Sequence, residues 1–450
     1  MSSPLLRNPI RSASGLCALA LCAFALLPVS PASAATRTVS NCNDSGQGSL
    51  RNVVANALSG DTIDLASLGC SRILLTNRAI EVPQDDLELV GRSRDALTID
   101  GNRSGRVFRH TGAGTLRLRR ISIANGYITG TQVFGGCIHS LGGVELIGSR
   151  LHHCELRAQG SLEPDGFGGG IYANRVLLSY SSAHSNIADG TSDGSGGAVW
   201  AALDVVLDHS QVHGNRAVNG GGVRGGSVTA TYSVIRGNEA RGGGGGGIFV
   251  DCDVPIPDCT LAVRKSTVSE NRAIVGGGID AQFADSASII ESTVSDNVAW
   301  ELAAASLPSP GETGIFNSTI AFNHEQPQVG ECSGAIDAYQ LRLESSIVAR
   351  NTCSLSGDYD ISGPSMSSQI VGANNIIGNS DLPVPPDTIS ARPRLGPLAD
   401  NGGPTPTRKP QADSPALDRG SNLLNHQYDQ RGPGFPRVKG PQADIGAYER

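Results

Sequence analysis

The stretch STVSENRAIVGGGID (residues 266–280) joins a short β-branched run to an asparagine and then to three glycines. The same arrangement recurs along the chain, with asparagines at spacings of 29, 23, 33, 26, 26 and 28 residues. A period of this size is typical of a solenoid, a propeller or an array. The recurring asparagines are Asn186, Asn215, Asn238, Asn271, Asn297, Asn323 and Asn351.

Two more columns accompany the asparagines. Five residues before each one stands a serine, and three before stands a small apolar residue, as in Ser266 and Val268. A Gly-aliphatic pair such as Gly278-Ile279 precedes most repeats. These segments are short, β-branched and alternating, which indicates strands, and the repeats are too short for a propeller blade of about 40 to 45 residues. The sequence therefore predicts an all-β, right-handed parallel β-helix of about 10 or 11 coils.

The columns also predict the inside of each coil. The serine and valine positions should alternate inward along one strand, and stacked asparagines should hydrogen-bond from one coil to the next. The glycines allow the tight turn into the following sheet. Because each coil advances about 4.8 Å, coils between residues 87 and 380 would make a rod of about 50 Å.

The N-terminal residues 1–34 resemble a secretory signal peptide. Arg7 and Arg11 precede an apolar run over residues 15–29, and Ala-Ser-Ala at 32–34 fits a cleavage site. An uncleaved anchor and a lipoprotein processed at Cys22 are the alternatives. We expect export to the extracellular space or cell surface, with the periplasm also open, and no transmembrane segment after cleavage, because no later run has 18 apolar residues.

The mature chain divides into three expected parts. Residues 35–86 should form an N-terminal cap and the first strands, with a helical pattern at 50–58. Residues 87–392 should form the β-helix, and residues 393–450 a Pro/Gly-rich capping tail, since a solenoid exposes its core at both ends.

Composition agrees with a repetitive β structure. Glycine accounts for 58 of 450 residues and aromatic residues for 4%. The formal charge is −7, and loss of two arginines with the signal peptide makes it −9. A mildly acidic chain lacks the basic footprint of a nucleic-acid-binding protein. Composition leaves the oligomeric state open.

Eight cysteines remain after the signal peptide. Cys137 stands in the aliphatic column and Cys154 in the asparagine column of one coil, so a disulfide should cross that coil. Two cysteines flank the insert DCDVPIPDC (residues 251–259), and the others pair by nearest neighbour, although other connectivities stay open. The predicted pairs are Cys42–Cys70, Cys137–Cys154, Cys252–Cys259 and Cys332–Cys353.

Motifs at both ends resemble a known group of proteins. NDSGQGSLR (43–51), LGPLADNGGPTPT (395–407) and DIGAYE (444–449) are similar to segments of exported bacterial proteins with a choice-of-anchor Q domain. The central rows resemble polymorphic outer-membrane protein repeats. One departure is Arg408, where similar tails often carry histidine. The resemblance implies a β-helix fold and export, and it implies no established activity.

One outward row carries candidate binding residues. The position two before the asparagine column reads His152, His184, His213 and Arg236 on four successive coils. Such a row suits contact with an acidic polysaccharide better than a metal site, because imidazoles in line converge poorly on one ion. The alternative is a solvated row of neutral imidazoles with no ligand.

The insert is the other candidate. Asp251, Asp253 and Asp258 could supply oxygen ligands to calcium, and the alternative is a charged loop that serves solubility. We expect no other cofactor.

No sequence motif identifies catalysis. The chain has no GxSxG, HExxH, Walker or CxxC motif. We therefore expect an exported, non-catalytic rod that acts in surface attachment, adhesion or glycan binding, with a polysaccharide or cell-surface component as partner. The alternative is a lyase or glycoside hydrolase acting on acidic polysaccharide, by analogy with other proteins of this fold class.

Overall fold

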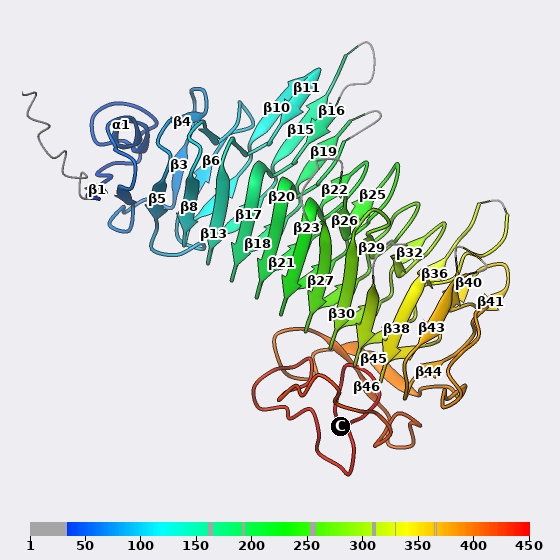
Figure 1. Cartoon of the computed structure of the whole chain (residues 1–450). Helices are drawn as coiled ribbons and strands as arrows, with labels where there is room; N and C mark the ends of the chain where they lie inside the picture. Colours follow the sequence, from blue (N-terminus) through cyan, green and yellow to red (C-terminus); the bar gives the residue numbers. More distant parts are fainter. Residues whose placement is uncertain are drawn as a thin grey trace, which may run out of the picture. The chain divides into compact units, whose positions relative to one another are not determined.

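A computed structural model describes residues 34–160, 165–190, 194–252, 258–307, 312–328, 330–363, 365 and 367–450. The predicted signal peptide lies outside these ranges except for Ala34. The described chain forms one short helix, α1 (Leu50–Ala55), and many short strands stacked side by side (Figure 1). Ser49 caps α1, because its Oγ accepts a hydrogen bond from the backbone N–H of Asn52 at 3.3 Å.

Each coil contributes one strand to a twelve-stranded parallel sheet, so the described chain makes about 12 coils. Eleven of these strands, β6 to β44, lie between residues 87 and 380, which confirms the predicted parallel β-helix. The twelve strands are β3 (Arg72–Leu74), β6 (Thr98–Asp100), β9 (Ser122–Ala124), β14 (Arg150–His152), β18 (Ser182–His184), β21 (Gln211–His213), β24 (Val234–Arg236), β28 (Thr267–Ser269), β31 (Thr293–Ser295), β35 (Thr319–Ala321), β39 (Ile347–Val348) and β44 (Ile376–Ile377).

A second sheet of 21 strands has two parallel runs, which the long strands β17, β20 and β23 join. Its strands are β1 (Thr36–Thr38), β2 (Thr62–Asp64), β4 (Ile80–Val82), β5 (Leu87–Val90), β7 (Phe108–His110), β8 (Thr115–Arg119), β12 (Ile138–Ser140), β13 (Gly143–Ile147), β17 (Ile171–Ser179), β20 (Val199–Asp208), β23 (Val223–Thr231), β26 (Ile248–Val250), β27 (Thr260–Arg264), β29 (Ile279–Asp280), β30 (Ser286–Ile290), β33 (Ala305–Ser306), β34 (Thr313–Phe316), β37 (Ile336–Asp337), β38 (Gln340–Glu344), β42 (Ile361–Ser362) and β43 (Gln369–Val371).

Smaller sheets complete the described chain, and all their pairs are parallel except β40–β41 and β45–β46. They contain β10 (Tyr127–Gly130), β11 (Gln132–Phe134), β15 (Glu155–Ala158), β16 (Asp165–Phe167), β19 (Ile187–Asp189), β22 (Arg216–Ala217), β25 (Glu239–Ala240), β32 (Val298–Ala299), β36 (His324–Glu325), β40 (Thr352–Cys353), β41 (Gly357–Asp358), β45 (Leu395–Ala399) and β46 (Thr407–Pro410).

The asparagine column forms a continuous hydrogen-bonded stack. Asn238 Nδ2 donates to Asn271 Oδ1 at 2.9 Å, and Asn271 Nδ2 donates to Asn297 Oδ1 at 2.9 Å. The stack ends on Asp360, whose Oδ1 accepts from both the backbone N–H and Nδ2 of Asn351. An aspartate suits this last position because the stack needs an acceptor there and no further donor.

The predicted interior is confirmed. The serine and valine columns are buried on every coil between β18 and β39, and the valine column belongs to one continuous apolar core. The Cys137–Cys154 disulfide crosses this core, with both residues fully buried. All four predicted cysteine pairs are bonded: Cys42–Cys70, Cys137–Cys154, Cys252–Cys259 and Cys332–Cys353.

The C-terminal tail packs along the side of the β-helix, whereas the sequence predicts a cap over its end. Thr267 Oγ1 donates to the Pro406 carbonyl at 2.6 Å, and Thr293 Oγ1 donates to Gln430 Oε1 at 2.6 Å. The tail, orange to red in Figure 1, therefore covers the outer side of the twelve-stranded sheet from β28 onward. Its chain fits there because the covered outer side chains are small, as in Ser295 and Ala321.

Arg408 anchors the C-terminal tail to the β-helix. Its guanidinium forms two 2.7 Å hydrogen bonds to the carboxylate of Asp296 and lies 4.0 Å from the ring centre of Phe322. It also donates to Ser295 Oγ at 2.6 Å. Both bonds to Asp296 come from Nη2 and the bond to Ser295 comes from Nε, so this side chain ties the tail to β31 and the turns after β31 and β35.

Candidate functional site

The predicted histidine row lies on four neighbouring strands of the twelve-stranded sheet. The strand register places His152 beside His184, His184 beside His213, and His213 beside Arg236. The imidazoles stack face to face, with ring centres 5.2 Å apart from His152 to His184 and 4.9 Å apart from His184 to His213. We call the outer side of β14, β18, β21 and β24 the open face.

The stacked imidazoles are neutral at physiological pH. Burial, followed by the charge of neighbouring His153 and Arg150, lowers the pKa of His152 to about 4. Burial and the adjacent imidazoles lower the pKa of His184 to about 4 as well, and burial beside Arg236 lowers that of His213. The row therefore presents the edges of stacked, uncharged rings to a ligand unless the pH falls far below 6.5.

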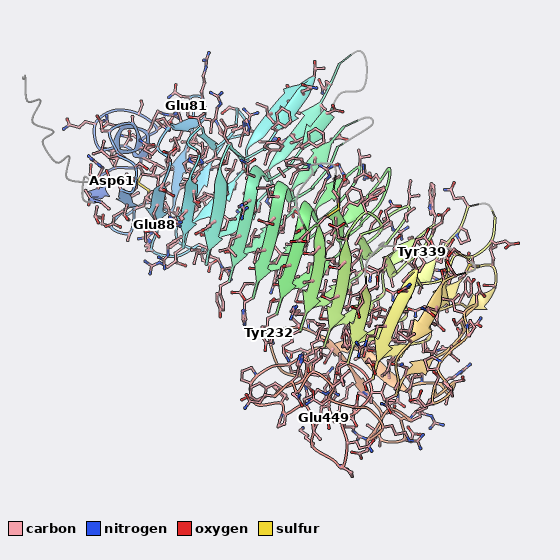
Figure 2. The ribbon with its side chains drawn as sticks, viewed as in Figure 1. Asp61, Glu81, Glu88, Tyr232, Tyr339 and Glu449 are labelled. Carbon is pink, nitrogen blue, oxygen red and sulfur yellow. A yellow bond between two sulfur atoms is a disulfide. The ribbon has the colours of Figure 1, made fainter. Side chains whose placement is uncertain are left out.

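A second aromatic row borders the first, and the sequence analysis missed it. Tyr180, His209 and Tyr232 stack with ring centres 4.7 and 4.8 Å apart. Each residue directly precedes a serine of the serine column and has a positive φ of 46 to 49°, so all three occupy the same turn. The signal in the sequence is a ring-bearing residue directly before the serine in three successive repeats. Figure 2 shows Tyr232 near the C-terminal tail, where burial and the charges of Glu291 and Asp429 raise its pKa.

The two rows enclose a hollow of about 470 Å³. Arg94 and Arg150 stand at one end of it, and the remaining lining comes from the two rows and the strands between them. Arg150 forms an ion pair with Asp95 at 2.7 Å, and the only acidic neighbour of His209 within ion-pair distance in the described chain is Asp208. Carboxylates near the hollow are thus already paired.

Arg236 borders a second hollow of about 220 Å³ at the other end of the open face. The tail supplies part of its lining through residues 403–406 and Asp400. Arg236 is exposed, and no acidic side chain of the described residues lies within ion-pair distance of it. Each end of the open face therefore carries at least one arginine, with Asp400 nearby at the Arg236 end and Asp95 paired with Arg150 at the other.

Two of the three aspartates of the acidic insert lie within the described residues, and each has a separate set of contacts. Asp251 forms an ion pair with Arg224, and the Asp258 carbonyl accepts a 3.1 Å hydrogen bond from Ser227 Oγ. Asp253 lies outside the described residues. Within the described ranges, no group of three or more His, Cys, Asp or Glu side chains is placed to hold a metal ion. Calcium binding at the insert stays a prediction.

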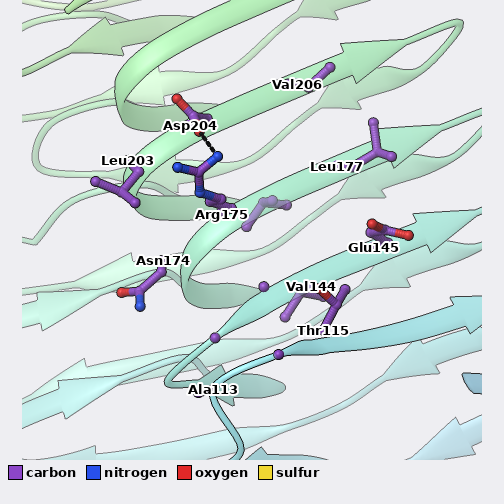
Figure 3. A pocket seen from close by; sticks show the side chains of 14 residues that line it. Ala113, Thr115, Val144, Glu145, Asn174, Arg175, Leu177, Leu203, Asp204 and Val206 are labelled. Carbon is purple, nitrogen blue, oxygen red and sulfur yellow. Dashed lines mark ion pairs between the residues drawn. The ribbon is translucent and has the colours of Figure 1, made fainter. Parts of the chain in front are cut away.

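Another hollow, of about 340 Å³, lies on the 21-stranded sheet (Figure 3). Its charged lining residues pair with neighbours: Arg175 with Asp204 at 3.0 Å, and Glu145 with Arg117 at 2.9 Å. This hollow is lined by backbone, apolar side chains and charges that are already paired. An ionic ligand would therefore find fewer unpaired charges here than on the open face.

One feature bears on location. The four disulfides are typical of proteins that fold in an oxidising compartment. In the part of the chain that the structure describes, no helix has the length and apolar character needed to cross a bilayer.

Comparisons with known proteins add little. No family model matches the sequence, and no curated protein matches it. Among solved structures, the chain is similar to the crystal structure of pectate lyase Pel9A, with 12% identity and a TM-score of 0.38, over 93% of this chain and 98% of that one. Similarity at this level carries no argument about function. The resemblance to choice-of-anchor Q proteins and outer-membrane repeats rests on the sequence motifs alone.

Proposed function

We propose that this chain is an exported, non-catalytic β-helix protein that binds an acidic glycan at the open face. The observation that carries the proposal is the pair of stacked ring rows, His152–His184–His213 and Tyr180–His209–Tyr232, with guanidinium groups at both ends.

Each part of this face suits a glycan. The outward edges of the uncharged imidazoles offer ring nitrogens to sugar hydroxyl groups, and arginine is the side chain best shaped for carboxylate and sulfate groups. Successive rings are about 5 Å apart, as the rungs of the β-helix dictate. A sugar chain that lies along the helix axis would meet an equivalent side chain at each rung.

A binding experiment tests the proposal. Immobilised polygalacturonate, alginate and heparin should retain the secreted protein, whereas neutral dextran should not. Retention should fall as sodium chloride rises, because exposed charge interactions are screened. Arg236→Ala should weaken binding by about tenfold, the value of one charge-assisted hydrogen bond.

The matched control is Arg175→Ala, which removes a paired arginine from the hollow on the 21-stranded sheet. Its binding should equal that of the natural chain. Loss of binding in Arg175→Ala together with normal binding in Arg236→Ala would place the glycan on the other sheet and reject the proposal.

Depolymerisation of an acidic polysaccharide is the alternative function, and one observation favours it. Burial raises the pKa of Asp280 to about 7 and that of Asp337 to about 6, values that suit a general acid. Strand pairing puts these residues two rungs apart, at about 10 Å. Asp280 is only 1% exposed, which argues against contact with a polymer.

The same polysaccharides test this alternative. New reducing ends or unsaturated uronides, lost in Asp280→Asn, would establish an enzyme in place of a binding protein. Retention on the polymers without any product would support the binding proposal.

A further inference from the structure

Around the histidine row, four consecutive rungs present an accessible outer side, those of β14, β18, β21 and β24. On the rung before β14, the outward side chains Ser122 and Ala124 of β9 are 1% and 0% exposed. On the rung after β24, Thr267 and Ser269 of β28 are 0% and 2% exposed. The row of binding side chains therefore stops at both ends of the open face.

A loop from an earlier coil closes the first end. Arg94, which follows β5, donates to the backbone carbonyl of Tyr180 at 3.1 Å, across 86 residues of sequence. Its neighbour Asp95 holds Arg150 at 2.7 Å. His152 Nε2 lies 2.9 Å from Ser122 Oγ, so the first imidazole packs directly on the closed rung.

The C-terminal tail closes the second end. Thr405 Oγ1 donates to the Lys265 carbonyl at 3.2 Å, and Pro406 accepts from Thr267 Oγ1 at 2.6 Å. Gln430 Nε2 also donates to Thr267 Oγ1, at 3.0 Å. A glycan that continued along the sheet beyond Arg236 would meet this buried contact.

The open face is therefore short. Four rungs are separated by three spacings of about 4.8 Å, which gives a length of about 14 Å. A hexopyranose unit extends a glycan by nearly one rung spacing. Resting on the proposed function, we infer that the site takes an acidic oligosaccharide, or the end of a chain, of about three or four units.

The charges sharpen this specificity. Arg94 and Arg150 lie at the first end and Arg236 lies at the last, whereas the rings between them are neutral. The preferred ligand carries a carboxylate or sulfate near each end, and its central units can be uncharged. A long uniform polymer gains nothing from units that extend beyond the closed ends.

Calorimetry with oligogalacturonides of two to eight units tests the inference. Affinity should rise up to four units and then stay within about twofold, because additional units have no rung to contact. A continued rise of tenfold or more between four and eight units would overturn the size limit while leaving glycan binding intact. Absence of binding by every oligomer and by the polymer would instead reject the proposed function.

Single-site variants separate the two ends. Arg236→Ala should weaken the tetramer by about tenfold but the dimer by less than about twofold, because a dimer can bind at the Arg94 end alone. Equal losses for dimer and tetramer would contradict the two-ended arrangement. Arg175→Ala, on the other sheet, is the control and should alter neither. Thermal unfolding of each variant confirms that it is folded.

Discussion

Replacing one asparagine of the stack should cost far more stability than a surface substitution of the same kind. Asn271 Oδ1 accepts from the backbone N–H of Asn238 at 3.0 Å and from Asn238 Nδ2 at 2.9 Å. Its own Nδ2 donates to the Ile235 carbonyl at 3.0 Å and to Asn297 Oδ1 at 2.9 Å. Asn271→Ala removes all four hydrogen bonds at a position that is 0% exposed.

The magnitude follows from the groups left without partners. Two donors of Asn238 become buried and unsatisfied, and each such group costs about 1 to 3 kcal/mol. We therefore expect the free energy of unfolding to fall by about 4 kcal/mol. The damage should stay local, because each coil of a solenoid contacts only its neighbours.

Urea unfolding measures this loss, and hydrogen exchange locates it. The amide of Asn238 should exchange much faster in Asn271→Ala, because that amide loses its acceptor. Asn174→Ala is the matched control: Asn174 is exposed and its side chain donates one hydrogen bond to the Leu141 carbonyl, so it should cost less than about 1 kcal/mol. Equal losses in the two variants would refute the reasoning.

Three further outcomes are expected. The double variant Cys137→Ala/Cys154→Ala should lose about 3 kcal/mol of unfolding free energy, since the disulfide closes a loop with a sequence separation of 17, and an unchanged urea midpoint would count against this. Folding lowers the pKa of His184 from 6.5 to about 4, so between these pH values the unfolded chain binds more protons than the folded chain, and the contribution of His184 to stability should diminish as the pH drops from 6.5 to 4. His184→Gln should therefore flatten this part of the plot of melting temperature against pH. A plot as steep as that of the natural chain would show the reasoning to be wrong. Arg408→Ala removes both hydrogen bonds to the Asp296 carboxylate and should loosen the tail, which limited proteolysis would report as faster cleavage within residues 393–450; proteolysis at the natural rate would contradict this role for Arg408.

The sequence was informative wherever spatial neighbours recur at the coil period. Asn238 and Asn271 are 33 residues apart in the chain and adjacent in space, because stacking converts one period into one rung. The same relation let the sequence place His184 between His152 and His213 and pair Cys137 with Cys154. The same relation holds for Tyr180, His209 and Tyr232, which recur in the column directly before the serines and stack in space.

Tertiary structure alone decided which rungs stay accessible. The contacts that close the open face join residues far apart in sequence, Arg94 to Tyr180 and Thr267 to Pro406, and they occur once each. A contact made once leaves no periodic trace, so the repeat cannot reveal it. The sequence therefore determined the β-helix and the row of imidazoles, whereas the packing of one loop and of the tail fixed the length of the candidate site.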